Sequence, residues 1–387
     1  MSLFNPYLVI AACLLTARAL AQSPDEQLKS VAKAAPEQLV ILSPQALMDF
    51  QELSDDRTEV NRTIVKSFTV DAKNALSIDN RFGDVIVSLW DRNEMRVEIA
   101  IRSSSENADR ARQALNAVSL DERRDGDTYL FKTVIASEFE GGWKKGDRRN
   151  FLRVDYRISM PKANKLAIKN SFGNTTIPDF WAPLSVESSF GNVYGAALNN
   201  LTTKIKASYG NVSIRDLQHG NVVMSFGDLD INSGNVLSIQ QTYGKLNLGE
   251  TNKLDVRTSY TDALIGSVRQ SGKFRMNYAR QFRLERIGAS ADKIDVEASY
   301  STIALPVQST PNCDFDVTVS HGGFSYPTLP NLQLLSQPGT PPNSPTGVSV
   351  TAPARPARVR QYVGKVGTGE GPSIKVVATY GDVRFNK

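Results

Sequence analysis

Histidine and cysteine are scarce in this sequence, which has two of each among 387 residues. Two histidines argue against a metal site rich in imidazole, and two cysteines exclude one built from several thiolates. Cys13 lies in an N-terminal apolar stretch, so Cys313 has no partner for an internal disulfide in the rest of the chain. The net charge of +5 is too small to indicate nucleic acid as a partner.

Long apolar runs are also missing. No stretch reaches the ~20 residues that a helix needs to cross a bilayer, so we expect no integral membrane protein. A short apolar run, Leu8 to Leu15, precedes Ala19-Leu20-Ala21, the small-x-small pattern that a signal peptidase accepts. We therefore expect residues 1–21 to be a cleaved leader and the protein to reach the periplasm, the outer surface or the medium. A buried N-terminal helix is the alternative, and lipidation at Cys13 is open.

One phrase recurs along the chain, with the form apolar-x-apolar-x-small-x-aromatic-Gly-Asn/Asp. From Phe172 to His321, which takes the aromatic position of a degenerate copy, successive copies are 17 to 22 residues apart. The aromatic residues and the glycines that follow them are candidate structural corners: Phe82, Gly83, Phe172, Gly173, Phe190, Gly191, Tyr209, Gly210, Phe226, Gly227, Tyr243, Gly244, Tyr260, Tyr278, Tyr300, Tyr380 and Gly381.

The phrase has period two, which is typical of a strand with one buried face. We expect its apolar positions and the aromatic to point inward, and the glycine to take the positive φ that turns the chain. The Asn or Asp that follows suits a turn by bonding its own backbone. A second short apolar pair, such as Val212 and Ile214, predicts a second strand in each repeat.

Stacked repeats bury the face that a single repeat leaves open, because each strand pairs with its equivalent in the next repeat. The predicted fold is all-β, a single-stranded parallel β-helix, or β-solenoid, of ~17–22-residue rungs with a small α/β N-terminal cap. An aromatic ladder would line one inner corner. The alternative is an antiparallel sandwich or barrel, whose strands also recur at short intervals.

The expected organisation follows from the position of the copies. Residues 1–21 form the leader, 22–60 a helical arm, 61–165 the first rung with the α/β cap, 166–325 the repeats, 326–371 a Pro-rich loop and 372–387 a closing rung. In the cap, Ser103 and Glu106 match a capping box before a helix that starts near Ala108. The last rung is expected to close the second end of the stack.

Few residues suggest chemistry. The loop at Trp143, Lys144, Lys145, Arg148 and Arg149 combines an aromatic with cations, and is a possible contact for an anionic glycan or lipid. A solvated insertion is the alternative.

Three further groups have mainly structural interpretations. Both histidines read as structural. The acids Asp228, Asp230 and Asp262 are better explained as turn carboxylates than as a calcium or sugar-cleaving site. The basic run from Arg269 to Arg286 would form a stripe if it faced outward. No catalytic, metal or cofactor motif is found, and we expect no cofactor.

Several segments resemble a known family. These are residues 76–85, the Ser-Phe-Gly-Asn and Ser-Tyr-Gly-Asn copies, the strand from Tyr156 to Met160 and the terminal Thr-Tyr-Gly-Asp-Val. Together they are similar to the putative adhesin family of domains of unknown function, secreted β-solenoid proteins of Gram-negative envelopes. The resemblance covers residues from about 62 to 387 and implies the architecture, with no ligand residues to carry over. The copies at Tyr278, Tyr300 and His321 depart from its pattern and predict irregular rungs.

The function expected from this reading is that of a non-enzymatic exported adhesin-like or scaffold protein, whose outward positions meet a glycan or another cell-surface polymer. The alternative is a carbohydrate-active β-helix enzyme, a polysaccharide lyase or hydrolase, which needs an acid and a base in one groove. A scaffold that assembles rung to rung is a third hypothesis, disfavoured by the expected caps.

Overall fold

The computed structural model describes residues 58–140, 151–307, 310–336 and 359–386. The predicted leader, most of the predicted arm, the Trp143 loop and residues 337–358 of the Pro-rich segment lie outside the described residues. Residues 58–60, the end of the predicted arm, belong to strand β1 (Thr58–Thr69). The described part is mostly β, with a large mixed sheet in which most strands pair in parallel.

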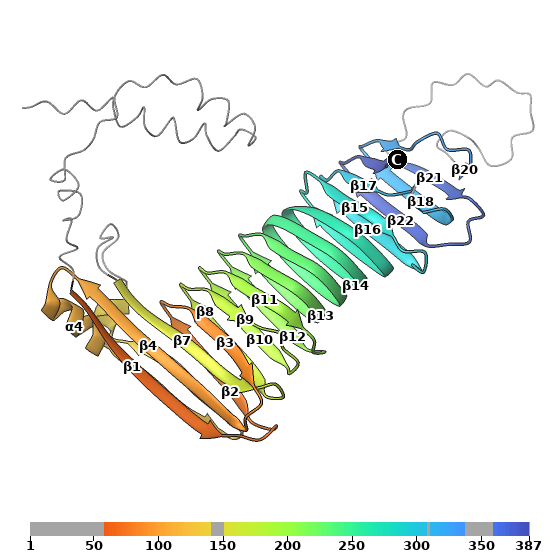
Figure 1. Ribbon diagram of the computed structural model, residues 1–387. Helices are drawn as coiled ribbons and strands as arrows, with labels where there is room; N and C mark the ends of the chain where they lie inside the picture. The colour runs from red at the N-terminus through yellow and green to blue at the C-terminus, as the bar shows by residue number, and fades with distance from the viewer. Residues whose placement is uncertain (1–57, 141–150, 308–309, 337–358, 387) are drawn as a thin grey trace, which may run out of the picture. The chain divides into compact units, whose positions relative to one another are not determined.

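The repeats contribute two rows of strands, one before and one after each aromatic residue (Figure 1). Row A, in spatial order, contains β2 (Ala75–Arg81), β8 (Lys165–Ser171), β10 (Leu184–Ser189), β12 (Thr203–Ser208), the second half of β13 (Val212–Ser225), parts of β14 (Leu229–Asn277), β16 (Lys293–Ser299), β22 (Ser373–Thr379) and β18 (Cys313–Ser320). Row B contains β3 (Val85–Trp90), β9 (Thr175–Ile177), β11 (Val193–Leu198), the first half of β13, parts of β14, β15 (Phe282–Ile287), β17 (Ile303–Leu305), β23 (Val383–Phe385) and β19 (Phe324–Ser325).

Parallel pairing places equivalent residues of successive repeats beside one another. In row A, Val186 of β10 lies opposite Ile168 of β8 and Ile205 of β12. All three side chains are at most 2% exposed. The predicted period of two is therefore confirmed for the apolar positions, and burying each such side chain contributes about 1.5–3 kcal/mol.

Antiparallel strands and a helix flank the first repeat. β7 (Phe151–Pro161) pairs in parallel with β3 and antiparallel with β4 (Glu94–Ser105), which pairs with β1. The hairpin of β5 (Val118–Asp125) and β6 (Thr128–Ile135) extends row A beyond β2. Helices α4 (Ala108–Asn116) and α5 (Ser137–Glu140) complete this region. The added strands cover parallel edges that would otherwise invite pairing with another chain.

The predicted capping box at the start of this helix is wrong. Ser103 lies inside β4. The N-cap of α4 is Asn107, whose side-chain oxygen accepts hydrogen bonds from the backbone N–H groups of Asp109 and Arg110 at 2.9 and 3.1 Å. The side chain of Asn107 therefore satisfies two of the N–H groups that have no partner inside the helix at its start.

The predicted closing rung is also in the wrong place. β22 does not end the stack, because it pairs in parallel with β16 on one side and with β18 on the other. Val376 of β22 lies opposite Val296 of β16 and Val317 of β18, so the insertion of β22 buries the Val376 side chain between two other valines. Beyond β18 come two antiparallel strands from the segment predicted as a loop, β21 (Val359–Val366) and then β20 (Leu332–Ser336). These strands cover the edge of β18.

Candidate functional site

A row of stacked aromatic side chains, called here the aromatic ladder, follows the corner between rows A and B. Among the described residues it contains eleven members, and successive ring centroids are 4.6–5.1 Å apart, with interplanar angles of 2–23°. In spatial order the ladder is Phe82, Phe172, Phe190, Tyr209, Phe226, Tyr243, Tyr260, Tyr278, Tyr300, Tyr380 and His321.

The ladder lies on the outside of the corner, which corrects the predicted inner position. Nine of its members, from Phe172 to Tyr380, have 42–52% of their surface exposed. All eleven have φ between +52° and +64°. This left-handed backbone breaks the alternation of the preceding strand, so that the side chain swings outward where continued alternation would point it inward. Stacking at about 0.5–1.5 kcal/mol per aromatic pair offsets part of the cost of that conformation.

The glycine after the aromatic has a different role from the one predicted. The aromatic residue takes the left-handed φ in every copy, and among the corner glycines only Gly244 also has a positive φ. A Cβ added to Gly191 would lie 1.9 Å from the carbonyl oxygen of Gly173, and one added to Gly210 would lie 2.0 Å from that of Gly191. Glycine is therefore required because successive backbones approach closely at this corner.

The Asn and Asp side chains that follow join one repeat to the next. The side-chain oxygen of Asn174 accepts a hydrogen bond from the backbone N–H of Asn192 at 3.0 Å, and that of Asn192 accepts one from Asn211 at 2.9 Å. The series continues from Asn211 to Asp228 and from Asp228 to Lys245. The predicted bond to the residue's own turn is thus replaced by a bond to the neighbouring repeat, which a single-repeat motif does not reveal.

Buried amides support the first corners from inside. The Asn80 side chain donates to the carbonyl oxygens of Val154 and Gly83 at 2.9 and 3.2 Å, and Asn170 donates to that of Gly83 at 3.1 Å. Both asparagines are at most 1% exposed. They satisfy carbonyl groups that burial would otherwise leave without partners.

An ion-pair cluster lies where the ladder meets the antiparallel strands. Arg153 contacts both Asp84 and Asp155, and Arg102 lies 2.7 Å from Asp155. Burial by itself would raise the pKa of Asp155. Its hydrogen bonds from the Asp84 backbone and from Arg153 and Arg102 outweigh burial and hold the pKa below its usual range. Three members of the cluster, Asp84, Arg102 and Arg153, line one open hollow together with Phe82, Phe172 and Phe190.

The other candidates do not form a site. The basic run does not form the single predicted stripe, because Lys273 and Arg275 belong to row A whereas Arg283 and Arg286 belong to row B. Part of its charge is neutralised, since Arg269 and Arg286 pair with Glu250 and Arg280 pairs with Asp262.

The three candidate acids make separate local contacts. The Asp228 carboxylate accepts from the Lys245 N–H, the Asp230 carboxylate accepts from the Asn247 amide at 2.7 Å, and the Asp262 carboxylate accepts from Arg280 at 2.8 Å.

The two histidines lie in different places. His321 stacks on Tyr380, whereas His219 lies in β13 away from the ladder.

The expected irregularity at Tyr278, Tyr300 and His321 does not affect the ladder. Ring spacing across these members is 4.6–4.9 Å, and their φ values match the others. In the part of the chain that the structure describes, no helix is long and apolar enough to span a bilayer. Nor do three His, Cys, Asp or Glu residues gather there as metal ligands.

No family model matches the chain, and no curated protein does. The chain is similar to solved structures described as putative adhesins. A putative adhesin from Bacteroides fragilis matches 84% of this chain and 97% of its own at 10% identity, with a TM-score of 0.30.

Two further structures match in the same way. A putative adhesin from Parabacteroides merdae matches the same shares at 14% identity, with a TM-score of 0.26. A putative cell adhesion protein from Clostridium sporogenes matches 84% and 99% at 10% identity, with a TM-score of 0.20. At these scores the matches carry no argument about function.

Proposed function

We propose that this chain is a non-enzymatic, exported adhesin-like or scaffold protein, built as a β-solenoid that presents its outward surface to a polymer of the envelope or cell surface. In this proposal residues 166–325 form the rungs, with Phe82 and Tyr380 as corners of two further rungs, and the leader at 1–21 directs export. The supporting observation is the aromatic ladder, because it is a long, regular and half-exposed surface.

The geometry of the ladder restricts how a ligand would bind there. Between the two end members, Phe82 and His321, both faces of each ring are covered by its neighbours at centroid distances near 4.9 Å, so only ring edges and phenolic hydroxyls meet solvent. A sugar ring cannot stack on a covered face, and contact would instead use the edges. From Tyr243 to Tyr380, five successive members carry hydroxyl groups that can donate and accept hydrogen bonds.

The alternative function, a carbohydrate-active enzyme, has less support. Hydrolysis of a glycosidic bond usually needs two carboxyl groups within one groove. Asp255 and Asp295 line one hollow of row A, but they are ion-paired with Arg257 and Lys293. The carboxylates of Asp230 and Asp262 bond instead to neighbouring side chains and backbone, Asp230 with Asn247 and Asp262 with Arg280 and Gln281. We infer a structural use for them.

A binding screen tests this proposal. Residues 22–387 would be applied to arrays of glycans and cell-wall polymers, with a parallel assay for released sugar ends. We expect retention without release. Product formation would overturn the non-enzymatic proposal, and absence of retention on every polymer would overturn the adhesin-like one.

Hydroxyl-deletion variants would then locate the contact. Changing Tyr243, Tyr260, Tyr278 and Tyr300 to Phe keeps the stack and removes four hydroxyl groups. We expect weaker retention with unchanged melting if the ladder makes the contact. The control changes Tyr194 and Tyr326, which are exposed but lie outside the ladder, to Phe, and it is matched by the ladder variant that changes only Tyr260 and Tyr278 to Phe.

A further inference from the structure

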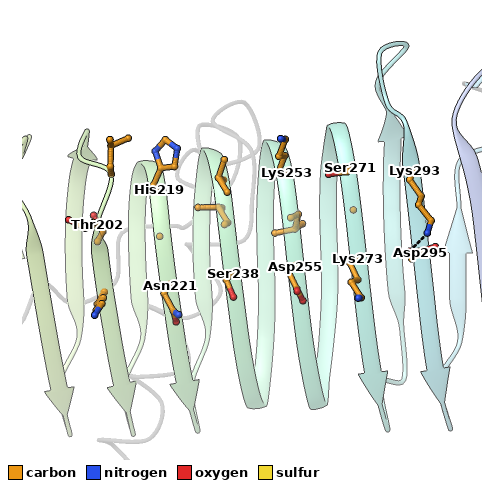
Figure 2. A pocket seen from close by; sticks show the side chains of 18 residues that line it. Thr202, His219, Asn221, Ser238, Lys253, Asp255, Ser271, Lys273, Lys293 and Asp295 are labelled. Carbon is orange, nitrogen blue, oxygen red and sulfur yellow. Dashed lines mark ion pairs between the residues drawn. The ribbon is translucent and has the colours of Figure 1, made fainter.

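A groove crosses the outward face of row A, at the ends of the strands far from the ladder. Its volume is about 590 Å³. Figure 2 shows two lines of side chains that cross the strands. The line at the strand starts contains Thr202, His219, Val236, Lys253, Ser271 and Lys293, and the line two residues further along contains Lys204, Asn221, Ser238, Asp255, Lys273 and Asp295.

The two lines arise from the register of the repeats. Lys204 lies opposite Asn221, which lies opposite Ser238, and Lys273 lies opposite Asp295. Because neighbouring strands are ~4.8 Å apart, each line presents a side chain at that interval, and every one of them except Val236 is polar. A ligand that fits the groove would therefore extend across the strands and carry functional groups at a regular spacing.

The charge of the groove is positive. Asp295 is paired with Lys293 at 2.9 Å, and Asp255 lies 3.6 Å from Arg257. Within the described residues, Lys204, Lys253 and Lys273 have no ion-pair partner. Three exposed ammonium groups remain available to an anionic partner, which would gain both attraction and counterion release.

The other groups in the groove discriminate among polyanions. No Phe, Tyr or Trp side chain lines it and His219 is the one imidazole in its lining, so it offers no continuous platform for stacked bases. Asp255 and Asp295, on the two sides of Lys273, place hydrogen-bond acceptors beside the ammonium groups and would repel a ligand that carries only anionic groups. Asn221 and Ser238 add partners for hydroxyl groups, and the exposed Val236 adds an apolar contact.

We propose that this groove binds an acidic polysaccharide, with uronic-acid carboxylates on Lys204, Lys253 and Lys273 and sugar hydroxyls on the neighbouring acids, on Asn221 and on Ser238. The chemistry requires a ligand that carries both anions and hydroxyl donors. The inference rests on the proposed function, since it names the class of polymer for that surface.

The test compares three polymers and two matched triple variants of the whole chain. The probes are polygalacturonate, dextran as the neutral polymer and inorganic polyphosphate as the anion without hydroxyl groups. The groove variant changes Lys204, Lys253 and Lys273 to Gln. The control changes Lys73, Lys132 and Lys169, which are exposed and lie outside the groove, to Gln, so both variants lose three charges.

We expect the unmodified protein to prefer polygalacturonate over both other probes. The Kd for polygalacturonate should rise roughly tenfold in the groove variant, since each exposed ion pair contributes modestly, and less than about twofold in the control. An equal loss in both variants, or a preference for polyphosphate, would overturn the inference. Binding of a neutral cell-wall glycan without polygalacturonate would overturn it and leave the proposed function standing; binding of no polymer would overturn both.

Discussion

Two stretches of the corner differ in the residue that directly follows each aromatic residue of the ladder. From Phe82 to Tyr243 that residue is glycine in every copy, whereas the next three copies carry Thr261, Ala279 and Ser301. These three side chains are at most 3% exposed. The stack continues through both stretches, with ring centroids 4.8–5.1 Å apart.

The difference shows that the ladder does not depend on glycine. Glycine serves close backbone approach in the first stretch and again after it at Gly381 and Gly322, but not in the three copies between. Gly244 marks the change of backbone, with φ of +148°, a value that other residues rarely adopt. The side-chain bonds between repeats change at the same place, because Lys245 donates its backbone N–H to the Asp228 carboxylate and has no side-chain oxygen to accept the next bond. In the second stretch the Ser301 hydroxyl instead accepts from the Ala279 N–H at 2.9 Å.

The largest effect is expected from adding a methyl group in the first stretch. Gly191→Ala places a Cβ 1.9 Å from the Gly173 oxygen, and we expect it to lower the free energy of unfolding by about 3 kcal/mol or more. Ala279→Gly, in the second stretch, should cost about 1 kcal/mol through chain entropy. Urea unfolding of both variants would measure this, and equal losses would contradict the distinction between the stretches.

A smaller effect is expected from removing one of the buried amide side chains, Asn80 and Asn170, which support corners of the first stretch. Asn170→Ala removes the donor to the Gly83 oxygen and should cost about 2 kcal/mol, because a buried carbonyl loses its partner. The equivalent position in the second stretch holds Met276, for which Met276→Leu should cost less than about 1.5 kcal/mol. Thermal unfolding would compare them. A tolerated Asn170→Ala would show that the amide is dispensable.

Ladder substitutions should affect both stretches alike. Phe190→Ala and Tyr278→Ala each remove two stacking contacts, and we expect each to cost about 1–2 kcal/mol. Tyr278→Phe is the control and should change stability little. If only one of the two alanine variants is destabilised, stacking stabilises one stretch and not the other, although the rings are evenly spaced through both.

The smallest effect is expected for the charge of Asp155, whose contribution to stability depends on pH. Because the pKa of Asp155 is lowered in the folded state, its contribution is present above the ordinary aspartate pKa, near ~4, and is lost as the pH falls through the lowered value. Asp155→Asn should therefore be less stable than the unmodified protein at neutral pH, and the difference should shrink toward pH ~3. Unfolding curves across this range would measure it. A constant difference would contradict the role of the charge.

Much of the strand pattern was predictable because it depends on local alternation. The apolar positions of β10 and β12 are buried where the period of two placed them. The outward ladder was not predictable from that period, since the left-handed backbone at Phe190 interrupts it. Nor were the bonds from Asn174 to Asn192 and onward, because their partner is a neighbouring repeat. The sequence predicted the lysines of the groove to be exposed, but not that they lie together, because they come from different repeats.

The sequence by itself determined the repeat, its strands and the spacing of its aromatic residues, because alternation and recurrence are properties of the chain alone. Only the tertiary structure decided which residue turns the chain, where the last repeat is inserted and which side chains meet across strands. The insertion of β22 between β16 and β18 shows the reason. Equivalent strands present nearly the same edge, so their spatial order depends on which arrangement buries the apolar positions and covers the final edge.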